Sequence, residues 1–494
     1  MVDLASLLEN TERRIDPNAW TSICTGLSID STGADEKGIK IQESKISVKD
    51  SNITTKHERR RDKLIRNGFA LVDESFDVQK VREGIEQLHE QNVPATFILL
   101  FDEAWQLACQ SKHVLEQASH KKNVFNYDLL AWYIKPGSPG FSPHRDRQPE
   151  DAPSTFHSDD QAKFITNWIA LSDATPENSC LYMIPKPYDP GYTSGDIDSV
   201  VDDKDGDKSQ DGEKENGNAD PLHRALSSKE KFQHIRCLPR KAGQSILFTH
   251  RIIHWGSQGD PADQDDAEQS TSASTISPRI AISFVCSDPD YEAPLLVNHK
   301  NYFSIDSDSS GGMPRFPPLQ IRLLLVCAQL LIYYQRFNLE KAVIKACYDY
   351  CKQNEEELEE GYRRKVFVEF VNAMKEHNET DKKDTGNKNI VSASTTFGNQ
   401  APSSSIQHFD PSGSHKVCDD DDDDDEDAML EEMLNAEAGG YGEFEDDYDE
   451  LEEDDDCDGS EDDLEEEGVD LFGGKRRNED TKSFENKKIK TFIS

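Results

Sequence analysis

Six short apolar segments between residues 127 and 286 constrain the fold more than any other feature of the sequence. Each is rich in β-branched or aromatic residues and is bounded by Pro, Gly, Asp or Asn, which is typical of strands. They are YDLLAWYIKPG (127–137), KFITNWIALSDA (163–174), SCLYMIP (179–185), QHIRCLP (233–239), QSILFTH (244–250) and RIAISFVC (279–286). No long helical pattern separates them. We therefore expect an antiparallel sandwich or barrel rather than a parallel sheet.

Helical periodicity appears on both sides of this strand-rich region. Before it, residues 57–68 favour a helix that ends at Gly68, a strand follows at 69–75, and residues 78–91 and 98–119 favour helix again. After it, residues 317–376 return to helix. We expect a mainly β fold with flanking helices, organised as a flexible, polar lead-in (1–57), a folded domain (58–300) and a helical extension that packs on it (301–377).

Three further segments are too polar to contribute to a core. Residues 191–230 and 258–276 are rich in Gly, Asp and Ser, and we expect them to be disordered inserts. Residues 378–494 are expected to be a disordered tail. Within it, residues 418–474 hold 31 Asp or Glu and no Lys or Arg, so this segment supplies most of the formal net charge of -42. Such a run of like charges repels itself.

The acidic tail has two interpretations, a solubilising segment or a binding site for basic partners such as histones. Direct binding to nucleic acid is not expected, because both are anionic. Residues 475–490, KRRNEDTKSFENKKIK, have the form of a bipartite nuclear import signal, which an import receptor would bind. The chain ends in FIS rather than a peroxisomal signal. We expect a nuclear or cytoplasmic location.

No secretory or membrane segment is expected. The N-terminal MVDLASLLENTERRID lacks a basic region followed by an apolar run, so we do not expect secretion. The most apolar stretch, residues 323–333, is too short to span a membrane. The ten cysteines are scattered, which favours free thiols in a reducing compartment. Cys347 and Cys351 lie one helical turn apart, and we expect them to pack in a core rather than bind a metal.

The segment FSPHRDRQ (141–148) places His144 and Asp146 two residues apart. In an extended strand, residues i and i+2 point the same way, so both side chains can reach one metal ion. Two histidines and one carboxylate on one face of the ion form the facial triad of non-haem iron(II) enzymes. The alternative is a solvent-exposed polar pair. A third ligand would come from AGQSILFTHRIIHWGS (242–257), which offers His254 or, as an alternative, His250.

A single arginine opens the last apolar segment. In RIAISFVC, Ile280, Ile282 and Phe284 share one face, whereas Arg279 shares the other face with small residues. An arginine in a barrel interior suits a carboxylate, which its guanidinium can bind in a bidentate way. The alternative is a surface salt bridge.

The ordered set of HxD, NW-I-AL, NSCLYMIP, KAGQSILF-x-x-R-x-x-H and a downstream arginine resembles the phytanoyl-CoA dioxygenase (PhyH-like) family. The resemblance covers roughly residues 60–300. It implies a double-stranded β-helix, the jelly-roll or cupin-like fold, that binds Fe(II) and the cosubstrate 2-oxoglutarate. It also implies that the His254–Arg279 spacing of 25 residues, longer than usual in the family, is accommodated by a polar insert that loops out between two strands.

The resemblance carries over to individual residues. His144, Asp146 and His254 match the metal ligands, and they would form the catalytic centre. Arg279 matches the residue that binds the distal carboxylate of 2-oxoglutarate. Two further matches to the cosubstrate pocket are Trp168, for which a place in the core is the alternative, and Ser257.

The family implies hydroxylation of a substrate C–H bond by O2, with 2-oxoglutarate converted to succinate and CO2, and with ascorbate as the reductant. The substrate, a small molecule or an acyl compound, is not identified by the sequence; hydroxylation of a protein or a nucleotide base is a variant of the same chemistry. The alternative from another class is a non-catalytic nuclear protein that uses its acidic tail to bind basic partners.

Overall fold

The computed structural model describes residues 1–29, 52–149, 151–196, 221–260, 276–303 and 316–386. The expected acidic tail (418–474), the basic segment (475–490) and the greater part of both polar inserts lie outside these ranges. The predictions made for them therefore stay predictions.

Two antiparallel sheets form the centre of the fold. The larger has the strand order β1-β6-β3-β8-β2, and the smaller has the order β5-β4-β7. The strands are β1 (Phe69–Val72), β2 (Val124–Ile134), β3 (Phe164–Ala170), β4 (Leu181–Ile184), β5 (Arg236–Leu238), β6 (Ser245–Thr249), β7 (Ile253–Gly256) and β8 (Arg279–Ser287). This arrangement confirms the expected mainly β, jelly-roll core with flanking helices. All six apolar segments form strands, and the sequence analysis missed only β7.

The two faces of the larger sheet differ in what they contact. On β8, Ile280, Ile282 and Phe284 belong to the large apolar core that includes the helices. Ala281, between them, belongs to a separate cluster with Trp168 of β3. The face assignment made from the sequence is therefore confirmed: one face is covered by helices, and the other lines the space between the sheets, where Arg279 begins β8.

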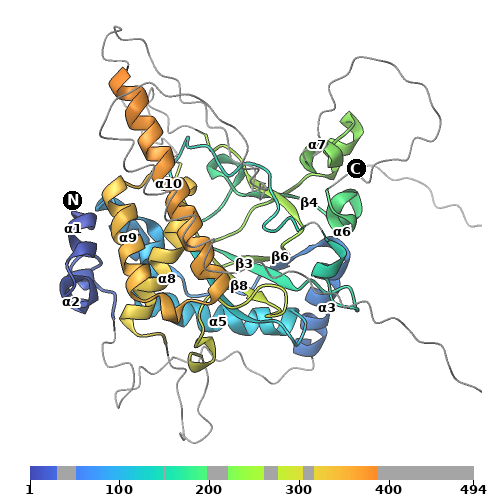
Figure 1. The fold of residues 1–494 in the computed structure, drawn as a ribbon. Coiled ribbons are helices and arrows are strands. Elements are labelled where there is room, and N and C mark those ends of the chain that lie inside the picture. The colour runs from blue at the N-terminus through green and yellow to red at the C-terminus, as the bar shows by residue number, and fades with distance from the viewer. Residues whose placement is uncertain (30–51, 150, 197–220, 261–275, 304–315, 387–494) are drawn as a thin grey trace, which may run out of the picture. The chain divides into compact units, whose positions relative to one another are not determined.

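Helices cover the outer face of the larger sheet. In Figure 1, α5 runs along β3 and β8, while α8, α9 and α10 group together, with α8 in contact with β2. Gly68 ends α3 as expected, since its φ of +79° favours glycine. The longer helices are α3 (Asn52–Asn67), α4 (Gln79–Glu90), α5 (Asp102–Ala118), α8 (Leu319–Ile332), α9 (Lys341–Gln353) and α10 (Glu360–Gly386), with the 3-10 segment η2 (Ala95–Leu100).

Residues 1–29 differ from the expected flexible lead-in. They form α1 (Leu4–Glu9), η1 (Arg13–Ile15) and α2 (Pro17–Thr21). Trp20 is fully buried and stacks on Phe97 at 5.2 Å between ring centroids. Arg14 donates to Gln353 on α9 at 2.6 Å. The start of the chain is thus packed on the helical layer, where Leu4, Leu7, Leu8 and Trp20 are buried.

Both ends of the first insert also carry local structure. Residues Gly191–Ser194 form α6 and Pro221–Ala225 form α7. Tyr192 is buried and its hydroxyl lies 2.6 Å from that of Thr249. The expected disordered segment 191–230 therefore includes ordered residues at both ends.

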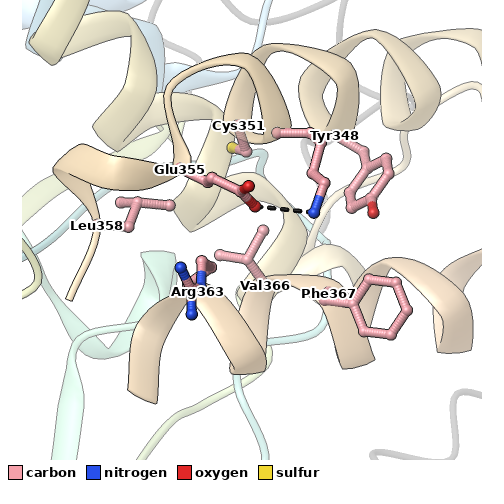
Figure 2. A pocket seen from close by; sticks show the side chains of 8 residues that line it. Tyr348, Cys351, Glu355, Leu358, Arg363, Val366 and Phe367 are labelled. Carbon is pink, nitrogen blue, oxygen red and sulfur yellow. Dashed lines mark ion pairs between the residues drawn. The ribbon is translucent and has the colours of Figure 1, made fainter. Parts of the chain in front are cut away.

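In the helical extension, α8 contacts β2 and η2, and α9 and α10 contact α8. Cys347 and Cys351 are buried in this core, which agrees with a packing role. A hollow between α9 and α10, lined by residues such as Tyr348 and Phe367, has a volume of about 20 Å³, room for one water molecule (Figure 2). No helix in the described part of the chain is long and apolar enough to cross a membrane.

Candidate metal centre and cosubstrate pocket

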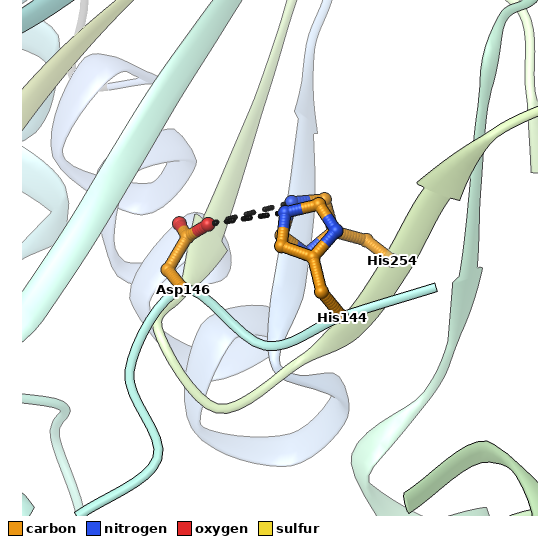
Figure 3. A group of neighbouring side chains, drawn as sticks. All are labelled: His144, Asp146 and His254. Carbon is orange, nitrogen blue, oxygen red and sulfur yellow. Dashed lines mark ion pairs between the residues drawn. The ribbon is translucent and has the colours of Figure 1, made fainter. Parts of the chain in front are cut away.

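Three predicted ligands meet at one point (Figure 3). The Nε2 atoms of His144 and His254 lie 3.7 Å and 3.5 Å from Oδ1 of Asp146. The potential ligand atoms of the three residues all lie within 4.8 Å of one another. A backbone bridge fixes the two histidines, since each donates its N–H to the other's carbonyl at 3.0 Å. The HxD loop thereby pairs with β7, although the two segments are about 110 residues apart in the sequence.

Hydrogen bonds orient each of the three side chains. Nδ1–H of His144 donates to the carbonyl of Ser142 at 2.8 Å, and Nδ1–H of His254 donates to that of Ile252 at 3.2 Å. A carbonyl only accepts, so both rings present a lone pair on Nε2. Thr166 on β3 donates its hydroxyl to Oδ2 of Asp146 at 3.1 Å, which leaves Oδ1 facing the histidines. Such outer contacts are what a metal site needs to hold its ligands.

The electrostatics keep His144 and Asp146 in the protonation states that bind a metal. Burial, with the neighbouring His254 and Arg336, lowers the pKa of His144 to about 3, so its ring is neutral near pH 7. Burial opposes ionisation of Asp146, but His254, His144 and Arg147 outweigh it and hold the pKa of Asp146 below its usual value. Neutral imidazoles and an ionised carboxylate are the forms that ligate metals, and two nitrogens with one oxygen fit iron(II).

Arg279 is buried with part of its guanidinium unsatisfied. Its side chain is 1% exposed, and neither Nε nor Nη2 has a hydrogen-bond partner among the described residues. Burial lowers its pKa to about 10, so it is still cationic at neutral pH. The rings of Trp168 and Phe141 lie 5.8 Å and 5.9 Å from it. A buried cation without a counter-ion is costly, so this site calls for an anionic ligand.

The geometry of β7 relates Arg279 to the metal cluster. A Cβ added at Gly256 would lie 3.6 Å from Nη1 of Arg279. Gly256 is two residues after His254, so both face the same side of the strand, about 7 Å apart. A five-carbon dicarboxylate can bridge such a gap. His254 and Arg279 are therefore close together in space although they are 25 residues apart in the sequence. Residues 261–275, which lie between them in the sequence, are outside the described ranges.

Ser179 is a pocket residue that the sequence analysis missed. Its hydroxyl is buried without a hydrogen-bond partner in the described part of the chain, and a Cβ at Gly256 would lie 2.8 Å from it. Its φ of +75° is unusual for a residue other than glycine. This backbone conformation places an unsatisfied hydroxyl beside the unsatisfied guanidinium. No sequence pattern signals it, because the conformation arises from the turn before β4.

The remaining predicted residues lie as follows. Trp168 is 5% exposed and belongs to the apolar cluster on the inner face, and the Arg279 guanidinium lies 5.8 Å from its ring centroid. Its role in a cosubstrate pocket stays a prediction. Ser257 donates its hydroxyl to the carbonyl of Pro176 at 3.4 Å. His250 is buried outside the ligand cluster, with Nδ1 3.2 Å from the carbonyl of Phe164.

A buried ion cluster supports the ligand loop from behind. Arg145 lies between the two ligands of the HxD pair, and its guanidinium is bound by Asp189 and Asp196 at 2.5–2.9 Å. It also donates to the carbonyl of Arg251. Arg251, the arginine of the second motif, donates to the carbonyl of Arg147 at 3.1 Å. Both motif arginines are therefore positioned to hold the ligand backbone rather than to contact the metal.

The helical extension reaches the same loop through Arg147. Glu292 binds this guanidinium in a bidentate way at 2.7 and 2.9 Å, and Asp128 binds it at 3.0 Å. Tyr333, just after α8, donates to Asp128, and Tyr362 of α10 donates to Glu292. Through these two carboxylates the helical extension helps to fix Arg147, the residue that follows Asp146. The extension is therefore connected to the metal cluster as well as to the apolar core.

Replacing Glu292 by Gln is expected to destabilise the fold in a pH-dependent way. Burial opposes ionisation of Glu292, but Arg147 outweighs it and lowers its pKa to about 2. Because the folded-state pKa lies below the unfolded one, the contribution of this carboxylate is complete above about pH 4.5 and is lost as the pH falls through about 2. The variant should lose about 3 kcal/mol of unfolding free energy at pH 7 and less at pH 3.

Thermal unfolding at both pH values measures this difference. Glu360→Gln, at an exposed i,i+4 pair on α10, is the matched control and should change stability little at either pH. An equal loss for Glu292→Gln at pH 7 and pH 3 would contradict the account.

Together, the jelly roll and the two-histidine, one-carboxylate cluster are the arrangement of non-haem iron oxygenases. Residues 56–259 match the family model of phytanoyl-CoA dioxygenase (PhyH), and the chain therefore contains a domain of this family. The match includes all three cluster residues and ends before Arg279.

Solved structures of low identity resemble the chain. The epimerase SnoN in complex with Fe3+, alpha ketoglutarate and nogalamycin RO is 18% identical, with a TM-score of 0.31, and the match covers 47% of this chain and 84% of that one. The carbocyclase SnoK is 15% identical, with a TM-score of 0.31 and coverage of 53% and 94%. EvdO2 from Micromonospora carbonacea var. aurantiaca is 14% identical, with a TM-score of 0.27 and coverage of 46% and 89%. No curated protein matches the chain.

Proposed function

We propose that this protein is an Fe(II)- and 2-oxoglutarate-dependent dioxygenase that hydroxylates a substrate whose identity is open, with release of succinate and CO2. The observation that carries the proposal is the short distance between the metal cluster of His144, Asp146 and His254 and the unsatisfied Arg279. His254 belongs to the cluster, and Gly256, two residues later on β7, lies beside Arg279. A metal site alone would fit many functions. A metal site beside a buried cation fits a metal-chelating dicarboxylate.

The residues would divide the work as follows. His144, Asp146 and His254 would hold the metal on one side and leave the other open. Arg279 would bind the distal carboxylate of 2-oxoglutarate, with the Ser179 hydroxyl as a second donor. When bound, iron(II) supplies the redox chemistry by which O2 oxidises both 2-oxoglutarate and a substrate C–H bond, and ascorbate would keep it reduced. The protein would fix the cosubstrate and exclude other groups.

The carboxylate ligand favours hydroxylation. Thr166 donates its hydroxyl to the Asp146 carboxylate and holds it in place, while Arg147, which donates to the Asp146 backbone carbonyl, lowers the pKa of the carboxyl and favours its ionised form. A site that retains this third ligand leaves no position for a halide. The epimerase SnoN and the carbocyclase SnoK make epimerisation and ring closure the alternatives within the class.

Arg279→Gln should raise the dissociation constant for 2-oxoglutarate about 100-fold, because two charge-assisted hydrogen bonds to a carboxylate would be lost. Metal binding should be unchanged, since Arg279 does not contact the cluster. Calorimetric titration of 2-oxoglutarate into the Mn(II)-loaded protein measures this. Arg82→Gln, in a partly exposed pair on α4, is the control and should bind like the wild type. Equal affinity in all three proteins would sink the assignment of Arg279.

The alternative of a non-catalytic nuclear binding protein depends on residues outside the described ranges. Nuclear import through residues 475–490 and binding of basic proteins by residues 418–474 remain proposals from the sequence. Both are compatible with an oxygenase, and no described residue favours them over catalysis.

A further inference from the structure

Two thiols lie side by side at the edge of the smaller sheet. The Sγ atoms of Cys180, just before β4, and Cys237, in β5, are 3.4 Å apart. Cys180 is fully buried, whereas Cys237 is exposed. β5 pairs with β4 alone, and so it lies at the edge of its sheet. A reagent in solution can therefore reach one thiol of the pair directly.

The buried thiol belongs to the wall of the Arg279 pocket. Cys180 is in the same apolar cluster as Trp168 and Ala281, which line the inner face of the larger sheet. It directly follows Ser179, whose hydroxyl lies beside Gly256, as Nη1 of Arg279 does. Burial raises the pKa of Cys180 to about 12, so it remains a protonated thiol, and the exposed Cys237 is the one that reacts first.

We propose that Cys180 and Cys237 form a peroxide-sensitive thiol pair whose oxidation to a disulfide weakens cosubstrate binding. This inference rests on the proposed function. The Cys237 thiolate attacks hydrogen peroxide, which breaks the O–O bond and gives a sulfenic acid and hydroxide. The Cys180 sulfur then attacks the sulfenic sulfur, expels hydroxide and loses its proton. In total, two thiols and one peroxide give one disulfide and two waters, and the two electrons pass from sulfur to oxygen.

The bond would change the pocket because the two residues are not directly opposite each other. Cys237 pairs with Tyr182, so Cys180 is its diagonal neighbour. Diagonal Cα atoms are about 7–8 Å apart, whereas a disulfide prefers about 5.5–6 Å. Closing the bond must draw the turn of Ser179 and Cys180 toward β5, and so change where the Ser179 hydroxyl lies relative to Arg279. The resulting strain would also make the bond easy to reduce, as a reversible switch requires.

The test uses the full chain, oxidised while free of metal so that iron does not react with peroxide. The protein is treated with hydrogen peroxide, catalase removes the excess, Mn(II) is added, and 2-oxoglutarate binding is measured by calorimetry. Peptide mass spectrometry under non-reducing conditions maps the linkage. We expect a Cys180–Cys237 disulfide and about tenfold weaker binding of 2-oxoglutarate, because part of one charge-assisted contact would be lost. Dithiothreitol should restore the affinity.

Two variants make the result specific. Cys237→Ser should bind 2-oxoglutarate like the wild type and be unaffected by peroxide. Cys109→Ser, at a partly buried thiol on α5, should remain as sensitive as the wild type. Failure to find the Cys180–Cys237 linkage, or a linkage with unchanged affinity, would overturn the proposal. If the linkage forms but the reduced protein does not bind 2-oxoglutarate, the proposed function fails and the coupling fails with it, whereas the thiol pair stands as an oxidation site.

Discussion

Asp146→Ala is expected to lower affinity for iron(II) by more than about 100-fold, since even residues that only orient metal ligands are worth about 10- to 100-fold. Asp146 supplies the one carboxylate of the cluster, and its Oδ1 faces both histidines. Without it, two neutral imidazoles would have to hold the ion alone. Metal titration of the purified protein, followed by the metal's own absorbance with Co(II) or by calorimetry with Mn(II), measures the change.

Asp73→Ala is the matched control for this experiment. Asp73 pairs with Arg240 at 3.0 Å, but its side chain is 72% exposed and lies outside the cluster. The control should bind metal like the wild type and unfold at a similar temperature. Wild-type affinity in Asp146→Ala would show that the cluster is not the metal site.

Arg145→Ala is expected to cause the largest loss of stability, about 3–5 kcal/mol, because removing one partner of a buried ion pair leaves uncompensated charges. The side chains of Arg145 and Asp189 are 0% and 1% exposed, and Asp196 would be left with Arg251 alone. Since Arg145 lies between His144 and Asp146, the loss should also loosen the metal site. Thermal unfolding and metal titration measure the two effects.

The comparison with Arg145→Lys separates charge from geometry. Lysine keeps the charge but not the planar fork that contacts two carboxylates and a carbonyl, so it should recover only part of the stability. Arg82→Gln serves again as the exposed control. A loss below about 1 kcal/mol for Arg145→Ala, typical of a surface pair, would contradict the role assigned to this buried cluster.

The sequence predicted those parts of the fold that depend on local periodicity. The alternation along residues 279–286 placed Arg279 on the inner face, because strand side chains alternate by geometry. The helix ending at Gly68 was predicted for a similarly local reason. β7 was missed because its four residues, IHWG, follow β6 after only three others and carry no turn signal of their own.

Long-range contacts were beyond sequence reasoning. Arg147 is bound by Asp128 of β2 and by Glu292 in the loop after β8, and each of these carboxylates accepts from a tyrosine of the helical extension. No local pattern connects these segments. Ser257 was assigned to the pocket by its position after His254; in the structure its hydroxyl donates to the carbonyl of Pro176, and its role in a pocket stays a prediction. Ser179 takes the place beside Arg279 through a positive φ that the sequence does not signal.

The central claim is that the cluster on FSPHRDRQ and β7 is a working iron site with 2-oxoglutarate as cosubstrate. The most direct measurement is succinate formed from 2-oxoglutarate by the purified chain with Fe(II), O2 and ascorbate, with His144→Ala beside the wild type. Slow conversion of 2-oxoglutarate in the absence of the substrate to be hydroxylated is sufficient for this test. The account predicts succinate from the wild type and none above background from His144→Ala. No succinate from the wild type, with no binding of metal or 2-oxoglutarate, would contradict it.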